Sequence, residues 1–433
     1  MTDSPLADGL LTDAEGRRGW QRLDEQVRAW WDEDLVTAHE EEVRADSNAL
    51  YLPEPYASGG GRVGPPWYRS MFAWDTWFSN LALLQHGRTD LVRNHAVDYL
   101  SMVERFGFMP NANQLALCTR SQTPVFPDGI LRYVRAVGDT ALLHRAYPAL
   151  VAEYTDYWGA AHHSTPCGLA TNADLGDPSL DPRLAAEAET GLDWTPIYDG
   201  DVRRVAPLIT NCALVRYAEV LAELADLLGE EEDAQRWRAE AGRRAALIRE
   251  LCWDEEAGFF FDYDHVAGRR LPHWSLCGFW PLWAGVATPE QAERAALALD
   301  RFRHPHGLTT TDRALPSPHA GMGEGDVQWM YPAGWAPLIV VAVWGLDRYG
   351  LHEAGLDAAE GFVRLMVRHF EETGELYEKY NVVTGGLELP NERYGTIRLH
   401  GWTSAAAVLL GRRVFEGTPL DRLVALGQEG TAV

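Results

Sequence analysis

Apolar residues recur three and four positions apart over most of the chain, which is the spacing of one face of an α-helix. In the segment 210–228 they fall at Leu214, Ala218, Leu221, Ala225 and Leu228. Gly229 ends this pattern, and a second one runs from Glu231 to Cys252. The two segments therefore predict a pair of antiparallel helices joined by a very short turn.

Similar patterns predict about eleven or twelve helices in all. Besides the first pair, they cover residues 23–43, 75–86, 89–105, 129–137, 140–158, 289–302, 336–349, 351–371 and 401–413. Strand signals are short and lie at 258–263 and 375–383. Long loops rich in Gly, Pro, Asp and Trp separate the helices at 51–70, 167–205, 303–334 and 383–399. This arrangement predicts an all-α fold, an α/α toroid with its long loops on one face.

The chain reads as one domain. Its 433 residues would allow two or three domains at about 150 residues each, but no linker or change of composition divides them. We expect a single domain over residues 15–418, with flexible tails at 1–14 and 419–433.

The charge balance argues against several classes of partner. The chain has 38 Lys and Arg against 63 Asp and Glu, a formal net charge of −25. Nucleic acids and anionic membrane surfaces both attract clustered cations, so neither is an expected partner. No apolar run approaches the roughly 20 residues that span a bilayer.

Cysteine usage and the first residues favour the cytoplasm. The five cysteines are widely spaced and form no Cys-x-x-Cys pair, so neither a zinc ribbon nor a disulfide framework is suggested. Residues 1–9 are acidic and lack the basic and apolar regions of a signal peptide. The sequence carries no signature of a particular oligomeric state.

Two loop carboxylates are candidates for acid–base chemistry on a sugar. The chain has 17 Trp, 16 Tyr and 13 Phe, and indole faces can stack on sugar rings as well as fill a core. Glycosidic bond hydrolysis needs one protonated carboxylic acid and one carboxylate on opposite sides of the bond. Asp193 is flanked by Leu192 and Trp194, and Glu378 lies between two tyrosines. Either residue alone is more often an ordinary loop carboxylate.

Several segments resemble glycoside hydrolase family 37, the trehalases, and they occur in that family's order. The matching segments are Gly-Gly-Arg at 60–62, Met-Phe-Ala-Trp-Asp-Thr-Trp-Phe at 71–78, Pro-Asn-Ala-Asn at 110–113, Thr-Arg-Ser-Gln-Thr-Pro at 119–124, Thr-Gly-Leu-Asp at 190–193, Gln-Trp-Met-Tyr-Pro-Ala-Gly-Trp-Ala-Pro at 328–337, Glu-Lys-Tyr-Asn at 378–381, Gly-Gly-Leu-Glu-Leu-Pro at 385–390 and Gly-Trp-Thr at 401–403. Met330 and Ala333 are departures from the family's pattern. The resemblance implies an (α/α)6 barrel, in agreement with the helix count.

Carried over residue by residue, the resemblance implies a set of roles. Asp193 would be the general acid and Glu378 the general base, with inversion of the anomeric centre. Residues implied to bind the sugar are Arg62, Trp74, Asp75, Asn111, Arg120, Gln122, Gly191, Trp329, Trp335 and Glu388. No metal and no organic cofactor is implied, because the two carboxyl groups supply both proton transfers. The implied partner is a small-molecule carbohydrate.

The segments on the leaving-group side differ from the family. The trehalases have Arg-Pro-Glu before the acid, whereas the stretch 171–177 contains no arginine. Residues 64–67, Gly-Pro-Pro-Trp, are inserted, and Ser70 replaces a glutamate.

The glycine-rich lid is reduced to residues 385–386 and followed by a longer arm, 391–400, with Arg393 and Arg398. This pattern also resembles glycoside hydrolase family 63, whose small bacterial members cleave mannosylglycerate or glucosylglycerate. An arginine of the arm could pair with a glycerate carboxylate, although arginines on a solvated loop are the commoner case.

The leading interpretation is an inverting glycoside hydrolase acting on a small α-glucoside, either a trehalose-like disaccharide or a glycosylglycerate. Two alternatives stay open: a sugar epimerase or isomerase, whose chemistry would favour paired histidines, and a non-catalytic sugar-binding helical scaffold. The acidic stretch 172–181 suggests a cation, but it lacks the pattern of an EF-hand loop, so a solvated loop is the alternative.

Overall fold

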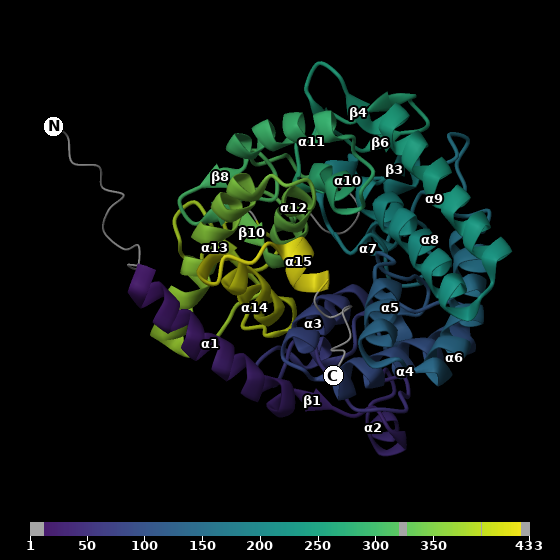
Figure 1. Cartoon of the computed structure of the whole chain (residues 1–433), viewed down its shortest axis with the longest axis horizontal. Coiled ribbons are helices and arrows are strands. Elements are labelled where there is room, and N and C mark those ends of the chain that lie inside the picture. The colour runs from purple at the N-terminus through teal and green to yellow at the C-terminus, as the bar shows by residue number, and fades with distance from the viewer. Residues whose placement is uncertain (1–12, 320–326, 391, 426–433) are drawn as a thin grey trace.

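The computed structural model describes residues 13–319, 327–390 and 392–425. Its helices (Figure 1) are α1 (Asp13–Glu33), α2 (Glu40–Ala45), α3 (Ala73–Gln85), α4 (Thr89–Phe106), α5 (Phe126–Val137), α6 (Thr140–Ala152), α7 (Pro182–Ala188), α8 (Leu208–Leu228), α9 (Glu231–Cys252), α10 (Trp280–Trp283), α11 (Pro289–Ala296), α12 (Ala336–Arg348), α13 (His352–Thr373), α14 (Gly401–Phe415) and α15 (Leu420–Ala425).

The strands are two or three residues long and form small antiparallel sheets. The pairs are β1 (Leu35–Val36) with β2 (Tyr56–Ala57), β4 (Trp253–Asp254) with β5 (Phe259–Phe260), β8 (Arg303–His304) with β9 (Gly307–Leu308), and β10 (Ala333–Trp335) with β11 (Lys379–Asn381). The one three-stranded sheet among the described residues has the order β3 (Val205–Ala206), β6 (Tyr263–Asp264) and β7 (Arg269–Arg270).

Six helices form a closed inner ring, in which each contacts the next: α3, α5, α8, α10, α12, α14 and back to α3. The helices α1, α4, α6, α9 and α13 pack outside this ring, and α11 lies at the outer rim (Figure 1). Two concentric layers of six helices are the architecture of an (α/α)6 toroid. The predicted fold class is confirmed.

The apolar pattern explains which helices lie inside. A helix surrounded by protein on all sides is apolar around its whole circumference, whereas an outer helix keeps one polar face. In α12 every residue from Ala336 to Asp347 is buried, and in α3 every residue from Ala73 to Leu83 is buried. The outer helix α9 buries only seven of its 22 residues.

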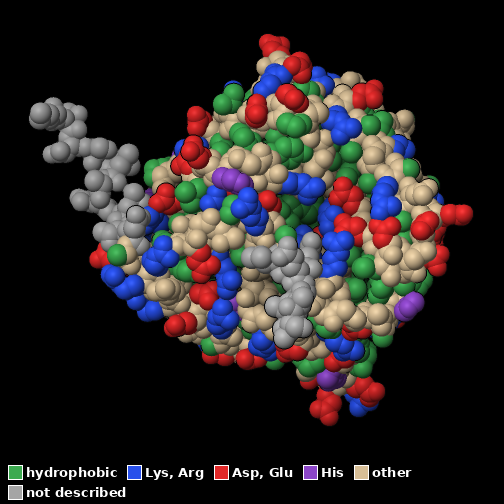
Figure 2. Space-filling model, in the orientation of Figure 1, with side chains coloured by type: hydrophobic (Ala, Val, Ile, Leu, Met, Phe, Trp, Pro, Cys, Tyr) green, Lys and Arg blue, Asp and Glu red, His purple; other side chains and the backbone are tan. Residues whose placement is uncertain are grey.

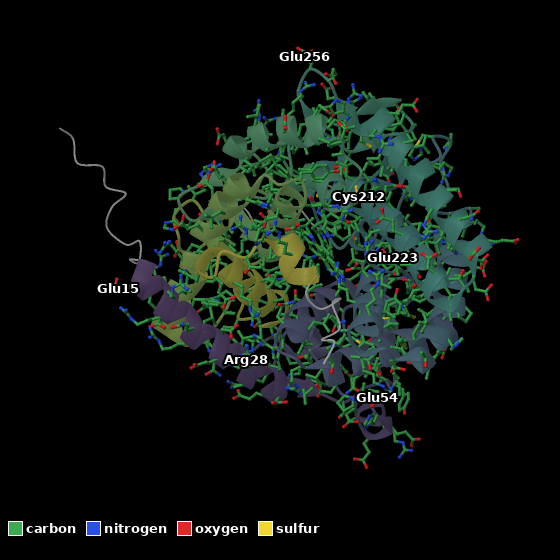
Figure 3. All side chains as sticks on the ribbon, viewed as in Figure 1. Glu15, Arg28, Glu54, Cys212, Glu223 and Glu256 are labelled. Carbon is green, nitrogen blue, oxygen red and sulfur yellow. The ribbon has the colours of Figure 1, made fainter. Side chains whose placement is uncertain are left out.

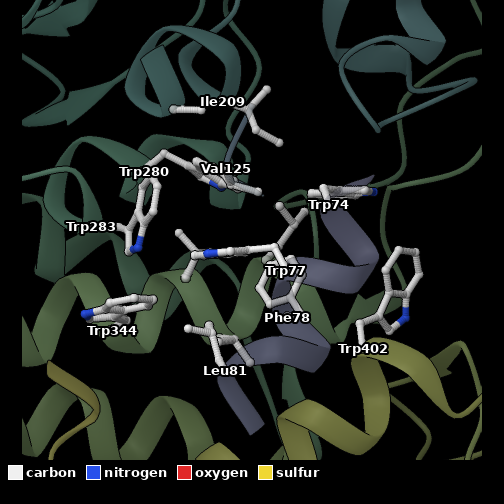
Figure 4. Packing of buried hydrophobic residues seen from close by; sticks show 14 of the residues in the cluster. Trp74, Trp77, Phe78, Leu81, Val125, Ile209, Trp280, Trp283, Trp344 and Trp402 are labelled. Atoms are coloured by element: carbon white, nitrogen blue, oxygen red, sulfur yellow. The ribbon is translucent and has the colours of Figure 1, made fainter. Parts of the chain in front are cut away.

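Tryptophans fill the middle of the ring. Trp77 of α3 stacks on Trp344 with ring centroids 6.0 Å apart and meets the edge of Trp283 at 5.7 Å (Figure 4). Trp74, one turn before Trp77, lies on the side of Trp402. The ring interior is therefore a packed core, and only the ends of the inner helices can provide a cavity.

Helix α15 closes the end of the ring at which the inner helices terminate. The amide of Leu420 donates to Asp347 of α12 at 2.8 Å, and Gln85 of α3 donates to the carbonyl of Leu423 at 3.0 Å. Leu420, at the start of the expected C-terminal tail, is buried. The packed part of the chain thus extends to Ala425, beyond the expected boundary at 418. The expected tails at residues 1–12 and 426–433 lie outside the described residues.

The predicted helix at 23–43 is interrupted. Helix α1 ends at Glu33, and the short strand β1 precedes α2. Asp34, which is buried, accepts hydrogen bonds from the amide of Arg62 at 2.8 Å and from His400 at 2.6 Å. These tertiary contacts turn the chain at Asp34, and local periodicity does not report them.

Charged side chains are spread over the face of the molecule seen in Figure 2. Figure 2 shows acidic and basic groups interspersed over the face that carries α15. Figure 3 places Glu15, Glu54 and Glu256 at the edge of the molecule and Cys212 inside it, and all five cysteines are free thiols. No helix in the described part of the chain has the length and apolar character needed to cross a membrane.

Candidate active site

Asp193 and Glu378 face the same cavity, which has a volume of about 240 Å³. It lies at the end of the ring where inner helices begin, because Trp74 and Asp75 are in the first turn of α3, Trp335 directly precedes α12 and Trp402 is in the first turn of α14. Each of the four long loops contributes lining residues, so the long loops do gather on one face. The other predicted site residues in the lining are Asn111, Arg120, Gln122, Gly191 and Trp329.

Four tryptophans form one wall of the cavity. Trp329 stacks on Trp335 at 3.7 Å between ring centroids, and Trp402 meets both rings edge-on at about 6 Å. Trp74 lies 5.8 Å from Trp329 and from Trp402. The indole N–H group of Trp335 has no hydrogen-bond partner among the described residues. The wall thus combines apolar faces for a sugar ring with a donor for a hydroxyl group.

Gly191 permits the close packing that this wall requires. Its φ of 79° lies in the left-handed region, and a Cβ at this position would lie 2.8 Å from the Trp74 ring. Only glycine satisfies both conditions without strain. Gly191 therefore lets the loop carrying Asp193 pass directly over Trp74.

Asp193 is held by the loop that follows residue 326. Gln328 Nε2 donates to the Asp193 carbonyl at 3.1 Å and to Oδ2 at 2.9 Å. Trp194 and Trp329, which directly follow Asp193 and Gln328, have φ values of 57° and 61°, and this strain for non-glycine residues is typical of functional sites. Burial raises the pKa of Asp193, although the nearby Arg393 opposes the shift. The raised pKa favours the protonated acid.

Glu378 lies directly before β11. Its Oε1 accepts a hydrogen bond from the Tyr394 hydroxyl at 2.9 Å, and its Oε2 lies 3.7 Å from Lys379 Nζ. Burial raises the pKa of Glu378, and the charge of Asp193 adds to that rise; Lys379 and the Tyr394 hydroxyl lower it. The charge of the candidate acid therefore acts on the ionisation of the candidate base.

Asp75 is a third carboxyl group in the cavity. It is 5% exposed, and its Oδ2 has no hydrogen-bond partner among the described residues. Burial raises the pKa of Asp75 to about 8, with further contributions from the charges of Glu378 and Asp193. At neutral pH a protonated Asp75 would donate as well as accept hydrogen bonds, which suits a sugar hydroxyl.

Arg120 explains the acidic stretch 172–181. Its Nη1 lies 3.1 Å from Asp174 and 2.8 Å from Asp177, and all three side chains are nearly fully buried. Asp181 pairs with Arg183 at 2.8 Å instead. The described residues hold no group of three or more His, Cys, Asp and Glu side chains arranged for a metal ion. The acidic residues here are ion-pair partners of arginines, and two of them bind Arg120, which lines the cavity.

Two residues of the predicted set do not line the cavity. The Arg62 side chain is 51% exposed and pairs with Glu33 at 2.9 Å; only its backbone amide contributes, by binding Asp34. Glu388 is exposed, and only its backbone carbonyl is bound, by Asn381 Nδ2 at 2.9 Å.

Several lining residues are absent from the predicted set. Tyr68, which follows the inserted Gly-Pro-Pro-Trp segment, shares a hydrogen bond of 3.0 Å with Tyr394 of the arm. Trp402 was visible in a matching motif but carried no role. The signal available was the concentration of aromatic residues in loops, which does not say which of them turn inwards. The remaining lining residues are Trp67, Phe72, Leu117, Leu180, Ala188 and Trp194.

A larger hollow, of about 610 Å³, lies on the outer wall between α6 and α9. None of the predicted site residues lines it. Its arginines are already paired: Arg243 and Arg244 both contact Glu240. We therefore place the chemistry in the smaller cavity, which holds the carboxyl groups.

Comparison with known proteins identifies the family. The family model described as trehalase matches residues 10–183 and 183–411, which is most of the chain. The chain belongs to the trehalase family. It is accordingly a glycoside hydrolase, and the alternatives of an epimerase and of a non-catalytic scaffold are not retained.

The relatives of this trehalase-family enzyme include two trehalases. It is 28% identical over 392 residues to a periplasmic trehalase of Pseudomonas aeruginosa, covering 80% of this chain and 69% of that protein. The neutral trehalase of Saccharomyces cerevisiae superposes with a TM-score of 0.69 at 25% identity, over 86% of this chain and 75% of that one. A family 63 mannosylglycerate hydrolase of Thermus thermophilus, solved with Tris and D-glycerate, shares the fold, with a TM-score of 0.59 at 17% identity over 93% of this chain and all of that one.

These comparisons correct one expectation. The acidic first residues and unpaired cysteines suggested a cytoplasmic location, but the curated relative with 28% identity is a periplasmic trehalase. The prediction of a cytoplasmic location is contradicted by that finding.

Proposed function

We propose that this trehalase-family hydrolase cleaves a small, two-unit α-glucoside with inversion, using Asp193 as general acid and Glu378 as general base. The observation that carries the proposal is that both carboxyl groups face one tryptophan-walled cavity. Paired carboxyl groups of this kind are what glycosidic hydrolysis requires.

The size of the cavity supports a small substrate. Ligand pockets commonly measure about 300–1,000 Å³, and this cavity of about 240 Å³ lies below that range. It suits one sugar ring with its leaving group at the mouth. Trp67, which is 62% exposed and also lines the cavity, is positioned to contact the leaving group.

In the proposed reaction, Asp193 gives its proton to the glycosidic oxygen as the bond to the anomeric carbon breaks. Glu378 accepts a proton from a water molecule that attacks the opposite face of that carbon, which inverts its configuration. Asp75, Asn111 and Gln122 would bind ring hydroxyls. The proposed mechanism requires a protonated Asp193 and an ionised Glu378. Burial raises the pKa of both groups, and Lys379 and the Tyr394 hydroxyl oppose that rise at Glu378.

The position of Arg393 supports a glycosylglycerate as a second candidate beside trehalose. Its guanidinium lies 3.6 Å above the Trp194 ring, next to the proposed acid, and its charge lowers the pKa of Asp193. A cation there would favour a carboxylate in the leaving group. The relatives are in keeping with both candidates, since one is a trehalase and another is a mannosylglycerate hydrolase.

Substrate and stereochemistry are tested together. Purified enzyme is incubated with trehalose, glucosylglycerate, mannosylglycerate and kojibiose, and the first product is followed by NMR that resolves the anomers. We expect β-glucose to be released first from an α-glucoside. Initial release of α-glucose would overturn the inverting mechanism, and no turnover of any of these compounds would overturn the substrate class.

A further inference from the structure

Lys379 is the only lysine among the 38 basic residues of the chain; the others are all arginines. It directly follows Glu378, and its side chain is fully buried. Lysine carries a compact point charge, whereas arginine needs room for a planar group with five donors. The single lysine thus occurs where a buried cation has to fit beside the proposed base.

The Lys379 ammonium lies between two carboxylates. Its Nζ is 3.1 Å from Glu392 Oε2 and 3.7 Å from Glu378 Oε2. It also lies 4.6 Å from the centroid of Trp335 and 3.8 Å from that of Tyr394, so its remaining contacts are aromatic faces. The Glu392 side chain is as deeply buried as that of Lys379.

Glu392 belongs to the arm, of which residues 392–400 are described. The arm is bonded to the segment 378–379 at several points: the Tyr394 hydroxyl donates to Glu378 Oε1 at 2.9 Å, Thr396 Oγ1 donates to the Lys379 carbonyl at 2.7 Å, and the Glu378 amide donates to the Ile397 carbonyl at 3.0 Å. The pair formed by Lys379 and Glu392 is the ionic member of this set of contacts.

We propose that Lys379 and Glu392 are a positioning pair for the base: the ammonium keeps Glu378 ionised inside the cavity, and Glu392 fixes the ammonium in place while anchoring the arm. This inference rests on the proposed function, because it assigns the pair a role in setting the protonation of Glu378.

The charges around Glu378 show why it needs such a partner. Asp193 and Asp75 face it from the opposite loop and from α3, and both are carboxyl groups. Tyr68 and Tyr394 contribute neutral hydroxyls, while Arg393 acts on Asp193. Lys379 is the cation whose charge lowers the pKa of Glu378, and it acts on Asp193 as well. Without it, a buried carboxylate among other acids would hold its proton, and a protonated Glu378 cannot activate water.

A buried ion pair is seldom retained for stability alone. Removing two charges from water costs several kcal/mol per ion, and apolar residues of the same volume often stabilise the fold at least as well. A requirement for charge at this position accounts for an ion pair here.

The test measures how kcat/KM depends on pH, with α-D-glucosyl fluoride as substrate. Fluoride leaves without being protonated, so the acidic limb of the profile reports the ionisation of the base in the free enzyme. Lys379→Met removes the charge and keeps the length of the side chain. Glu392→Gln replaces the carboxyl group that holds the ammonium by a neutral amide. Burial raises the pKa of Glu392 to about 7 although Lys379 opposes the shift, so the negative charge that this variant removes is the one present from neutral pH upwards. Thr396→Val is the matched control, since it removes the two hydrogen bonds between Thr396 Oγ1 and the backbone of Lys379 without changing charge.

We expect Lys379→Met to move the acidic limb up by about one pH unit or more, because an opposite charge within ~4–6 Å lowers a carboxyl pKa by about 1–3 units. Glu392→Gln should move it in the opposite direction, and Thr396→Val should lower the rate without moving the limb. If the acidic limb of the kcat/KM profile stays at the wild-type pH in both charge variants, the proposed role of the pair is overturned. If Lys379→Met does not fold, as judged by circular dichroism, the direction of the Glu392→Gln shift decides alone.

The same substrate separates this inference from the function on which it rests. Glu378→Gln should abolish turnover of the fluoride. If Glu378→Gln is inactive and the limbs do not move, only the pair is overturned; if Glu378→Gln retains the wild-type rate, the proposed base is overturned as well.

Discussion

Gln328 holds Asp193 at two atoms, donating to its carbonyl at 3.1 Å and to its carboxyl Oδ2 at 2.9 Å. The backbone N–H of Gln328 donates to the backbone carbonyl of Trp194 at 2.8 Å. Hydrogen bonds from Gln328 to Asp193 and Trp194 thus connect the loop of the proposed acid to the loop that carries Trp329 of the wall. Orientation of the carboxyl group depends on this junction.

Gln328→Met keeps the volume of the side chain and removes both side-chain hydrogen bonds. We expect kcat on the natural substrate to fall by about 10²-fold, as is typical when a reacting group is misplaced by about 1 Å. The loss should be much smaller on α-D-glucosyl fluoride, whose leaving group needs no proton. An equal loss on both substrates would show that Gln328 acts on something other than the acid.

Replacing the two catalytic carboxyl groups should have different effects on the two substrates. Asp193→Asn removes the proton donor, so turnover of a disaccharide should fall by about 10²–10⁴-fold while the fluoride is still cleaved. Glu378→Gln removes the base that both substrates require, so neither should be hydrolysed. Turnover rates of the two variants on both substrates check the assignment. If Asp193→Asn loses as much activity on the fluoride as on the disaccharide, Asp193 is not the general acid.

A feature of the fold can be predicted from the sequence when neighbouring residues set it, and cannot when residues far away along the chain set it. The α8–α9 pair is local: the apolar spacing and Gly229 define it, and the structure has it within two residues. The break at Asp34 is not local, because it depends on Arg62 and His400, which are 28 and 366 residues away. Periodicity reports the first kind of feature and not the second.

The same division applies to the site. Most of the residues taken from matching motifs do line the cavity, because the motifs mark chain segments that converge there. The direction of a side chain within a segment is a tertiary property. Glu388 is exposed, whereas Glu392, four residues later, is buried against Lys379. Choosing between two glutamates on one loop requires knowing which neighbour can pair with it.

Asp75 should make stability depend on pH. Burial raises the pKa of Asp75 from 3.8 to about 8, so between these values the folded protein holds a proton that the unfolded chain releases. The contribution of this group to stability is therefore present below about pH 4 and is lost as the pH rises towards 8. Asp75→Asn stays neutral throughout.

We therefore expect Asp75→Asn to be more stable than the wild type at pH 8 by about 2 kcal/mol or more, and to approach it at pH 4. Urea unfolding at the two pH values measures the difference. KM for the substrate should rise in the same variant, because the carboxyl group binds sugar hydroxyls. A difference in stability that does not change with pH would show that Asp75 has an ordinary pKa.

Gly191 and Gly138 form a matched pair for testing the wall. Both have a positive φ, 79° and 72°, but a Cβ at Gly191 would lie 2.8 Å from Trp74, whereas a Cβ at Gly138 meets nothing within 4 Å. Gly191→Ala should lower the free energy of unfolding by about 1–3 kcal/mol and reduce activity strongly. Gly138→Ala should cost about 1 kcal/mol and leave activity unchanged. Equal activity in the two variants would show that the position of the Trp74 ring does not matter for sugar binding.

Arg393 decides between the two candidate leaving groups. If its guanidinium recognises a carboxylate, Arg393→Gln should raise KM for a glycosylglycerate by about 10-fold or more, since a hydrogen bond to a charged group contributes about 1.5–3 kcal/mol. The KM for trehalose, which carries no charge, should change little. Arg398, which is exposed on the same arm, provides the control variant Arg398→Gln. Parallel changes for both substrates in Arg393→Gln would instead assign the residue to holding Trp194, over which it lies at 3.6 Å.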